Sequence, residues 1–290
     1  MTKLLQTLPF AFMLAASVAL GWRPLVSTWT LALSNEAYTH ILLILPLSCM
    51  LIYLERDVLP SRFRRGVATG SALLAVGLLL AGFARFGGSG WPQDVRLFLS
   101  MFALVTWWIG CTAFFLGIRA SRVLVFPLCF LFLLVPIPAI ALDEIIHFFQ
   151  QQSALAARVL FLAAGVPASQ DGIMLSIPGL DIEVARECSS IRSSLMLIVT
   201  TMVLAHLFLR SWWRKAMLIA VAVPLAAAKN GLRIFVIAEL GTRVDPGFLD
   251  GNLHHHGGIV FFAISLVVMA TLLWGLRRTE ITRSQTLGSA

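Results

Sequence analysis

The sequence predicts an all-α polytopic membrane protein with about eight transmembrane helices, and three observations support this. Hydrophobic residues make up 59% of the 290 residues, against roughly 45 to 50% in a soluble globular protein. Charged residues fall to 12%, where about 25% is usual. Long apolar runs recur along the whole chain instead of forming one terminal anchor. A water-soluble domain is therefore excluded, and we expect one integral membrane domain over residues 1–290.

A helix needs about 17 to 25 mostly apolar residues to cross the hydrocarbon core of a bilayer. Stretches of this kind lie at 4–21, 38–54, 67–83, 97–116, 123–142, 190–209, 216–238 and 257–275. The first also has the character of a secretory signal, but no clear cleavage site of small residues follows it, so we expect it to remain as a helix. The segment 143–165 begins with Asp143 and Glu144 and contains three consecutive glutamines. We expect it to be an interfacial or re-entrant helix, because a ninth span here would place Arg210, Arg214 and Lys215 on the outer side.

Lysine and arginine gather in alternate connections, which predicts the orientation in the membrane. These cations are Lys3, Arg56, Arg62, Arg64, Arg65, Arg119, Arg122, Arg210, Arg214, Lys215, Arg277, Arg278 and Arg283. We expect their face to be cytoplasmic, with both termini inside and a cytoplasmic tail at 277–290 that lacks order after Arg278. The net charge of +8 is then a matter of topology, and no nucleic-acid partner is expected.

The outer connection at 166–187 has the pattern of a short β-hairpin. Apolar residues alternate at Ile173, Leu175 and Ile177, Pro178-Gly179 interrupts them, and the alternation resumes at Ile182 and Val184. The hairpin leads directly to Cys188 and the sixth helix. The other three cysteines, Cys49, Cys111 and Cys129, lie in apolar runs, where we expect buried thiols that serve packing.

Three polar residues converge on the outer leaflet, where ionisable groups are costly and often functional. Cys188 lies at the outer end of the sixth helix, Arg233 in the outer half of the seventh, and His254 just before the eighth. A thiolate, an imidazole and a fixed cation together suit acyl transfer through a thioester. A helix N-terminus at Cys188 and the nearby Arg192 would favour the thiolate.

Each of these residues also has a structural interpretation. A boundary cysteine is often inert, Arg233 can pair with Glu239 along the polar path of a transporter or in a scaffold, and consecutive histidines occur in solvated loops. His254, His255 and His256 have Asp250 as their one nearby carboxylate, so we expect no metal site and no cofactor.

The same residues occur within an ordered series of motifs that resembles the exosortase and archaeosortase family of membrane transpeptidases. The motifs are Val135-Pro136-Ile137-Pro138, Gly165-Val166-Pro167, Ile177-Pro178-Gly179, Ile182-Glu183-Val184-Ala185, Cys188-Ser189-Ser190-Ile191-Arg192-Ser193, Arg210-Ser211-Trp212-Trp213-Arg214, Asn230-Gly231-Leu232-Arg233 and Leu253-His254 with Gly257-Gly258. The resemblance covers residues 131–275, which we take as the core. Two departures are Ser190, where the family usually has glycine, and Arg186, where an acidic residue is common.

The resemblance implies a cysteine protease or transpeptidase with Cys188 as the nucleophile, Arg233 as the essential cation and His254 as the acid/base group. The register of the family motif favours His254 over His255 and His256. Arg192, Asn230 and Glu187 are expected to support the site. The substrates implied are exported proteins with a C-terminal sorting signal, in many bacteria a Pro-Glu-Pro motif, a transmembrane segment and a basic tail (PEP-CTERM).

The resemblance further implies a bacterial inner membrane protein whose active site faces the periplasm or outer surface, in a setting of polysaccharide or glycoprotein export. A non-enzymatic transporter or scaffold of such an export system is the alternative, although a transporter would be expected to show paired polar breaks in both halves. An endopeptidase that only hydrolyses its substrate would use the same residues.

Overall fold

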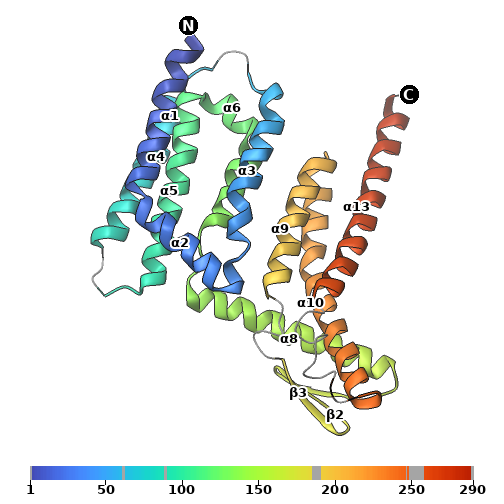
Figure 1. Ribbon diagram of the computed structural model, residues 1–290. Helices are drawn as coiled ribbons and strands as arrows, with labels where there is room; N and C mark the ends of the chain where they lie inside the picture. The colour runs from blue at the N-terminus through green and yellow to red at the C-terminus, as the bar shows by residue number, and fades with distance from the viewer. Residues whose placement is uncertain are drawn as a thin grey trace. The chain divides into compact units, whose positions relative to one another are not determined.

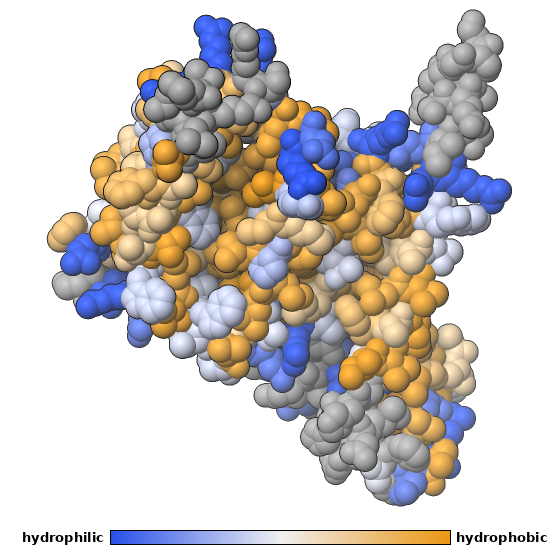
Figure 2. All heavy atoms as spheres, turned by 45° about the horizontal axis from the view of Figure 1, so that its top comes forward, coloured by the Kyte–Doolittle hydropathy of each residue, from blue (hydrophilic) through white to orange (hydrophobic). Residues whose placement is uncertain are grey.

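The computed structural model describes residues 2–60, 63–87, 90–184, 191–245, 247 and 258–288. The described chain is helical apart from one small antiparallel sheet, and it forms two compact units, Met1–Ala141 and Leu142–Ala290. In Figure 2, orange apolar side chains cover much of the visible surface. Such a surface suits a lipid environment.

The first unit is helical in its described residues (Figure 1, blue to green). Its elements are α1 (Thr2–Leu20), α2 (Trp22–Ser34), η1 (Glu36–Tyr38), α3 (Ile41–Glu55), η2 (Arg56–Val58), α4 (Val67–Phe86), α5 (Gln93–Phe115), α6 (Gly117–Val123), α7 (Val125–Phe130) and η3 (Leu131–Leu134). The helices α4 and α5 pack closely because Gly70 leaves no side chain between them: a Cβ there would lie 2.5 Å from Cα of Phe114. Small residues permit this approach of helix backbones in membranes.

The second unit contains α8 (Ala139–Ala163), which begins just before it, then three strands and three long helices. These are β1 (Ser169–Asp171), β2 (Met174–Ile177), β3 (Leu180–Glu183), α9 (Ile191–Phe208), α10 (Trp212–Arg243) and α13 (Gly258–Gly288). In Figure 1, α8 lies crosswise to α10. A buried apolar cluster joins α9, α10 and α13, and its central residues include Ala205, Leu218 and Met269.

Six described helices are long and apolar enough to cross a membrane, and two bent helix pairs bring the number to eight if each pair is one span. The six are Glu36–Val58, Val67–Phe86, Gln93–Phe115, Ile191–Phe208, Trp212–Arg243 and Gly258–Glu280. The pairs are Leu8–Leu20 with Trp22–Ser34, bent by 66°, and Gly117–Val123 with Val125–Leu134, bent by 74°. The prediction of a mostly helical, multi-pass membrane protein is confirmed, with six to eight candidate spans. The side of the termini and the single domain remain predictions.

The predicted C-terminal boundary of the span at 123–142 is wrong. Its helical part stops at Leu134, because Pro136 and Pro138 cannot continue a helix, and the next helix, α8, starts at Ala139. This 25-residue helix replaces the shorter segment expected at 143–165, and it is not among the six candidate spans. Its place at the membrane interface remains a prediction.

Two further expectations need correction. The tail after Arg278 is helical as far as Gly288, because the sequence up to that point contains no proline or glycine after Gly275 to interrupt α13. The thiol of Cys111 is buried as expected, whereas Cys49 and Cys129 are exposed. Apolar helix faces in a membrane protein contact lipid as well as protein, so an apolar run does not by itself bury a thiol.

The expected β-hairpin is confirmed and extended by one strand. Strands β2 and β3 pair antiparallel around Pro178 and Gly179, and Gly179 has φ of +84°, which suits the third position of a type II turn. The additional strand β1 pairs with β2 on its other edge. Its three residues, Ser169, Gln170 and Asp171, are polar and carry no apolar alternation that would predict a strand.

One face of the sheet packs on α8 and α10. Leu175 and Ile177 of β2 join a buried cluster with Phe161 of α8 and Ile234 of α10. At the centre of this junction α8 and α10 approach closely, because a Cβ at Gly231 would lie 2.5 Å from Cβ of Ala156. The junction therefore holds the sheet, α8 and α10 together.

Gly231→Ala should loosen this junction, because the added methyl group has to displace α8. We expect a loss of about 1 to 3 kcal/mol in the free energy of unfolding. Thermal unfolding in detergent measures it, with Gly275→Ala as the control, since a Cβ at Gly275 of α13 meets no other atom within 4 Å. Equal melting temperatures for the two variants would contradict the close contact of α8 and α10.

Candidate functional site

The helix α10, one of the candidate membrane spans, carries a polar stretch formed by Lys229, Asn230 and Arg233. Asn230 is fully buried, and Lys229 is 5% exposed. Lys229 and Arg233 lie one helical turn apart and so share a face of α10. Burial of charged and amide groups within an apolar helix is costly, which marks this part of α10 as the candidate site.

The first turn of α9 is attached to this stretch. The Lys229 ammonium donates a hydrogen bond to the hydroxyl of Ser193, and Ser193 lies two residues after the start of α9. Ser194, the next residue, is fully buried, whereas Arg192 is exposed. The contact fixes the start of α9 beside the α10 turn that leads to Arg233.

The end of the sheet is attached to α8 by a residue that the sequence pattern does not single out. The side-chain amide of Gln150 donates to the carbonyl oxygen of Val184 at 2.6 Å, and the N–H of Val184 donates to the carbonyl oxygen of Ile173 at 3.0 Å. Both Gln150 and Val184 are buried. Three consecutive glutamines look alike in the sequence, and only the buried face of α8 distinguishes Gln150 from Gln151 and Gln152.

These two attachments flank the segment 185–190, which contains the predicted nucleophile. The chain before it is fixed at Val184 by Gln150 of α8, and the chain after it is fixed at Ser193 by Lys229 of α10. The helix that anchors the second end also carries Arg233. The chain on one side of the Cys188 segment is therefore attached to α8, and the chain on the other side is attached to α10, the helix that carries the predicted cation.

Part of the predicted site lies within the described residues. Arg192, Asn230 and Arg233 are described, and the last two share one turn of α10. Cys188, Glu187 and His254, with His255 and His256, lie outside the described residues. The meeting of Cys188, Arg233 and His254 accordingly remains a prediction. Among the described residues, no three histidine, cysteine or carboxylate side chains form a group that could hold a metal ion.

The alternative pairing of Arg233 with Glu239 is not favoured by the helix geometry. The Glu239 carboxylate forms an ion pair with Arg243, one turn further along, at 2.8 Å. Residues six apart, as Arg233 and Glu239 are, do not share a helix face. Glu239 thus has its own partner at the end of α10.

Gln150→Met should weaken the attachment of Val184, because the sulfur side chain keeps the shape but leaves the buried carbonyl oxygen without its donor. We expect a cost of about 1 to 3 kcal/mol. Faster hydrogen exchange in peptides covering residues 173–184 is the measurement. Gln151→Met is the control, because the Gln151 amide makes an exposed contact with His147; equal exchange in both variants would contradict this role of Gln150.

Comparison with known proteins identifies the family. A family model described as transmembrane exosortase matches residues 28–271. No curated protein and no solved structure matches the chain. The match includes most of the first unit, the sheet and the polar stretch of α10. With most of its length matched by that one model, this multi-pass membrane protein belongs to the transmembrane exosortase family.

Proposed function

We propose that the protein is a membrane-embedded cysteine protease or transpeptidase that cleaves C-terminal sorting signals from exported proteins. The observation that carries this proposal is the pair of attachments around the Cys188 segment, at Val184 and Ser193, the second of which is made by the helix bearing Arg233. A nucleophile needs a backbone that is held in place relative to the groups that activate it. Membership of the exosortase family supports the same chemistry.

In the proposed reaction, the Cys188 thiolate attacks the carbonyl carbon of the scissile peptide bond. A C–S bond forms, the C–N bond breaks, and the leaving amine takes a proton from the imidazolium of His254. The substrate is then held as a thioester, and its membrane tail is released. An acceptor amine or water attacks the thioester, gives its proton to His254 and restores the thiolate.

Arg233 is proposed to stabilise the negative charge on the thiolate and on the oxyanion. A guanidinium offers planar, forked N–H donors, and donors that are already in position when negative charge develops on the reacting atoms lower the barrier. Asn230, one turn before it and fully buried, supports the orientation of this part of α10. Arg192 and Glu187 are proposed to set the local charge around the thiol.

The position of Arg233 along α10 supports a site on the outer side of a bacterial inner membrane. Cations gather at the other end of α10, where Arg214 donates to the carbonyl oxygen of Leu276 and the Glu280 carboxylate accepts from the N–H groups of Arg210 and Ser211. Arg233 lies roughly 21 residues beyond Trp212, or about 32 Å along a helix, close to the ~30 Å thickness of a hydrocarbon core. With the cationic end in the cytoplasm, Arg233 reaches the opposite boundary.

The proposed substrates are exported proteins that end in a transmembrane sorting signal, such as the PEP-CTERM type. A transporter or scaffold in polysaccharide export is the competing function. Both bent helix pairs lie in the first unit, whereas transporters tend to carry such breaks in corresponding halves. The described structure thus adds no observation in favour of transport.

Cys188→Ala should abolish removal of the C-terminal tail, because no other thiol can form the thioester at that position. C-terminal mass spectrometry of exported proteins, at matched abundance of the membrane protein, is the measurement. Cys49→Ala and Cys129→Ala are controls, since both thiols are exposed elsewhere in the chain. Identical C-termini in wild type and Cys188→Ala cells would overturn the proposal, and new C-termini bearing an acceptor would indicate transpeptidation.

Arg233→Gln should slow tail removal by about 100-fold or more, the usual effect of removing one group that stabilises an oxyanion. Arg233→Lys should recover only part of this, because an ammonium does not reproduce the planar donor geometry of a guanidinium. The rate of tail removal from a pulse-labelled substrate measures both. Arg243→Gln, on the same helix with a side chain 62% exposed, should process at the wild-type rate; equal slowing by both glutamine variants would argue against a specific role of Arg233.

A further inference from the structure

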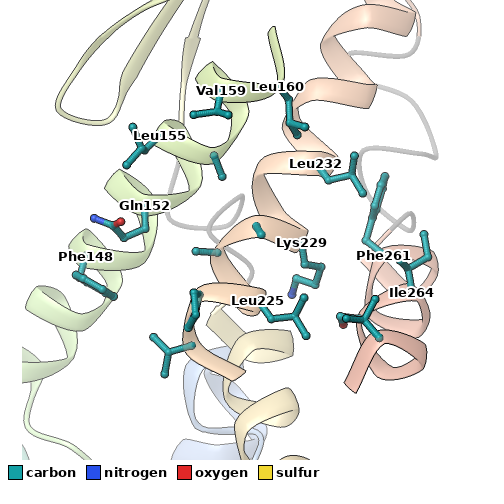
Figure 3. A pocket seen from close by; sticks show the side chains of 17 residues that line it. Phe148, Gln152, Leu155, Val159, Leu160, Leu225, Lys229, Leu232, Phe261 and Ile264 are labelled. Atoms are coloured by element: carbon teal, nitrogen blue, oxygen red, sulfur yellow. The ribbon is translucent and has the colours of Figure 1, made fainter. Parts of the chain in front are cut away.

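An apolar groove runs between α8, α10 and α13 in the second unit (Figure 3). Its volume is about 690 Å³. In the figure, Leu155 and Val159 of α8 lie on one side, Ile264 of α13 lies on the other, and Leu225 and Lys229 of α10 lie between them. Gln152, Lys229 and Ser265 are the polar residues among those that line it, so the groove is built to hold an apolar partner.

The sides of the groove are open and its floor is closed. Leu155, Val159 and Ile264 are 43%, 57% and 46% exposed, whereas Ala227 and Lys229 on the floor are buried. The lining extends along the candidate span α10 from Val223 to Leu232, which is about 14 Å of helix. A groove of this length covers a little under half of a hydrocarbon core of about 30 Å.

The small residues of the groove favour a helix as the occupant. Ala156 of α8 and Ala227 and Ala228 of α10 line it, and small side chains let two helix backbones approach within a membrane. A lipid acyl chain does not need small side chains in order to pack against the groove. The partner expected from this lining is therefore an apolar transmembrane helix.

Lys229 connects the groove with the candidate site. Its side chain lines the groove, and its ammonium donates to Ser193 at the start of α9, five residues beyond Cys188. An ammonium has three N–H donors, and the Ser193 hydroxyl takes one of them. A cation in a mostly apolar groove complements an anionic group on the partner, which a plain hydrocarbon chain does not offer.

We infer that this groove seats the transmembrane segment of the exported substrate, with an anionic group of the substrate near Lys229. A helix lying along α10 in this way brings the substrate chain toward the start of α9, which Lys229 of the groove contacts at Ser193. The inference rests on the proposed function and adds the surface that recognises the substrate. A substrate helix with an anionic group also explains why the apolar groove and the buried ammonium of Lys229 occur together beside the candidate site.

Ala228→Trp tests the groove, because Ala228 is exposed and its side chain points into the lining, so that an indole fills the space without entering the protein core. The matched control is Ala220→Trp, an exposed alanine of the same helix that does not line the groove. We expect tail removal to slow at least tenfold in Ala228→Trp and to stay at the wild-type rate in Ala220→Trp. Both variants are compared at equal membrane abundance and with melting temperatures measured in detergent.

A second measurement does not depend on turnover. A benzophenone amino acid is placed at position 228 or 220 in the Cys188→Ala chain, together with an exported reporter that ends in a tail which Cys188→Ala cells retain. Photocrosslinking should attach the tail at position 228 and not at position 220. Adducts with lipid alone, or equal adducts at both positions, would overturn the groove as the substrate surface.

The outcomes separate the two proposals. Tails retained in both Cys188→Ala and Ala228→Trp cells support the groove. Tails retained in Cys188→Ala cells but removed at the wild-type rate by Ala228→Trp overturn the groove and leave the proposed function standing. Tails removed normally in Cys188→Ala cells overturn the proposed function, and the groove proposal with it.

Discussion

The crossing of α8 over α10 at Gly231 is the constraint on which the second unit depends. Without a side chain at Gly231, Ala156 and the backbone of Ala157 come against α10, and the apolar cluster with Phe161 and the sheet forms around them. The same placement of α8 brings Gln150 to the carbonyl oxygen of Val184. One close helix contact thus fixes the sheet, the chain that leads to Cys188 and one wall of the apolar groove.

Two buried polar side chains of this unit, Gln150 and Lys229, each attach one element to another. In a medium without water, a buried ammonium or amide is tolerated when it makes hydrogen bonds, and such bonds then hold elements firmly. Lys229 joins α10 to the start of α9, and Gln150 joins α8 to the end of β3. The proposed acyl transfer needs a nucleophile whose backbone is held in place, and these two bonds attach the chain on either side of the predicted nucleophile.

The opposite end of the unit is organised by a carboxylate. Glu280 of α13 accepts from the N–H groups of Arg210 and Ser211, at the start of α10, where helix N–H groups otherwise lack partners. In the same region, the Arg214 guanidinium of α10 donates a hydrogen bond to the carbonyl oxygen of Leu276 in α13. Arg233 lies 21 residues beyond Trp212 on the same helix, a distance of about 32 Å, which is close to the thickness of a hydrocarbon core.

The sequence alone determined the membrane class, most spans, the hairpin around Pro178-Gly179 and the candidate residues Cys188, Arg233 and His254, because composition, periodicity and short motifs are local properties. Only the tertiary structure decided the bends between α1 and α2 and between α6 and α7, the strand β1, and which glutamine of α8 is buried. It also decided that Lys229 meets Ser193, 36 residues away in the chain. Contacts of this kind depend on which helix faces meet, and that is settled when the close approach at Gly231 and the surrounding apolar clusters form together.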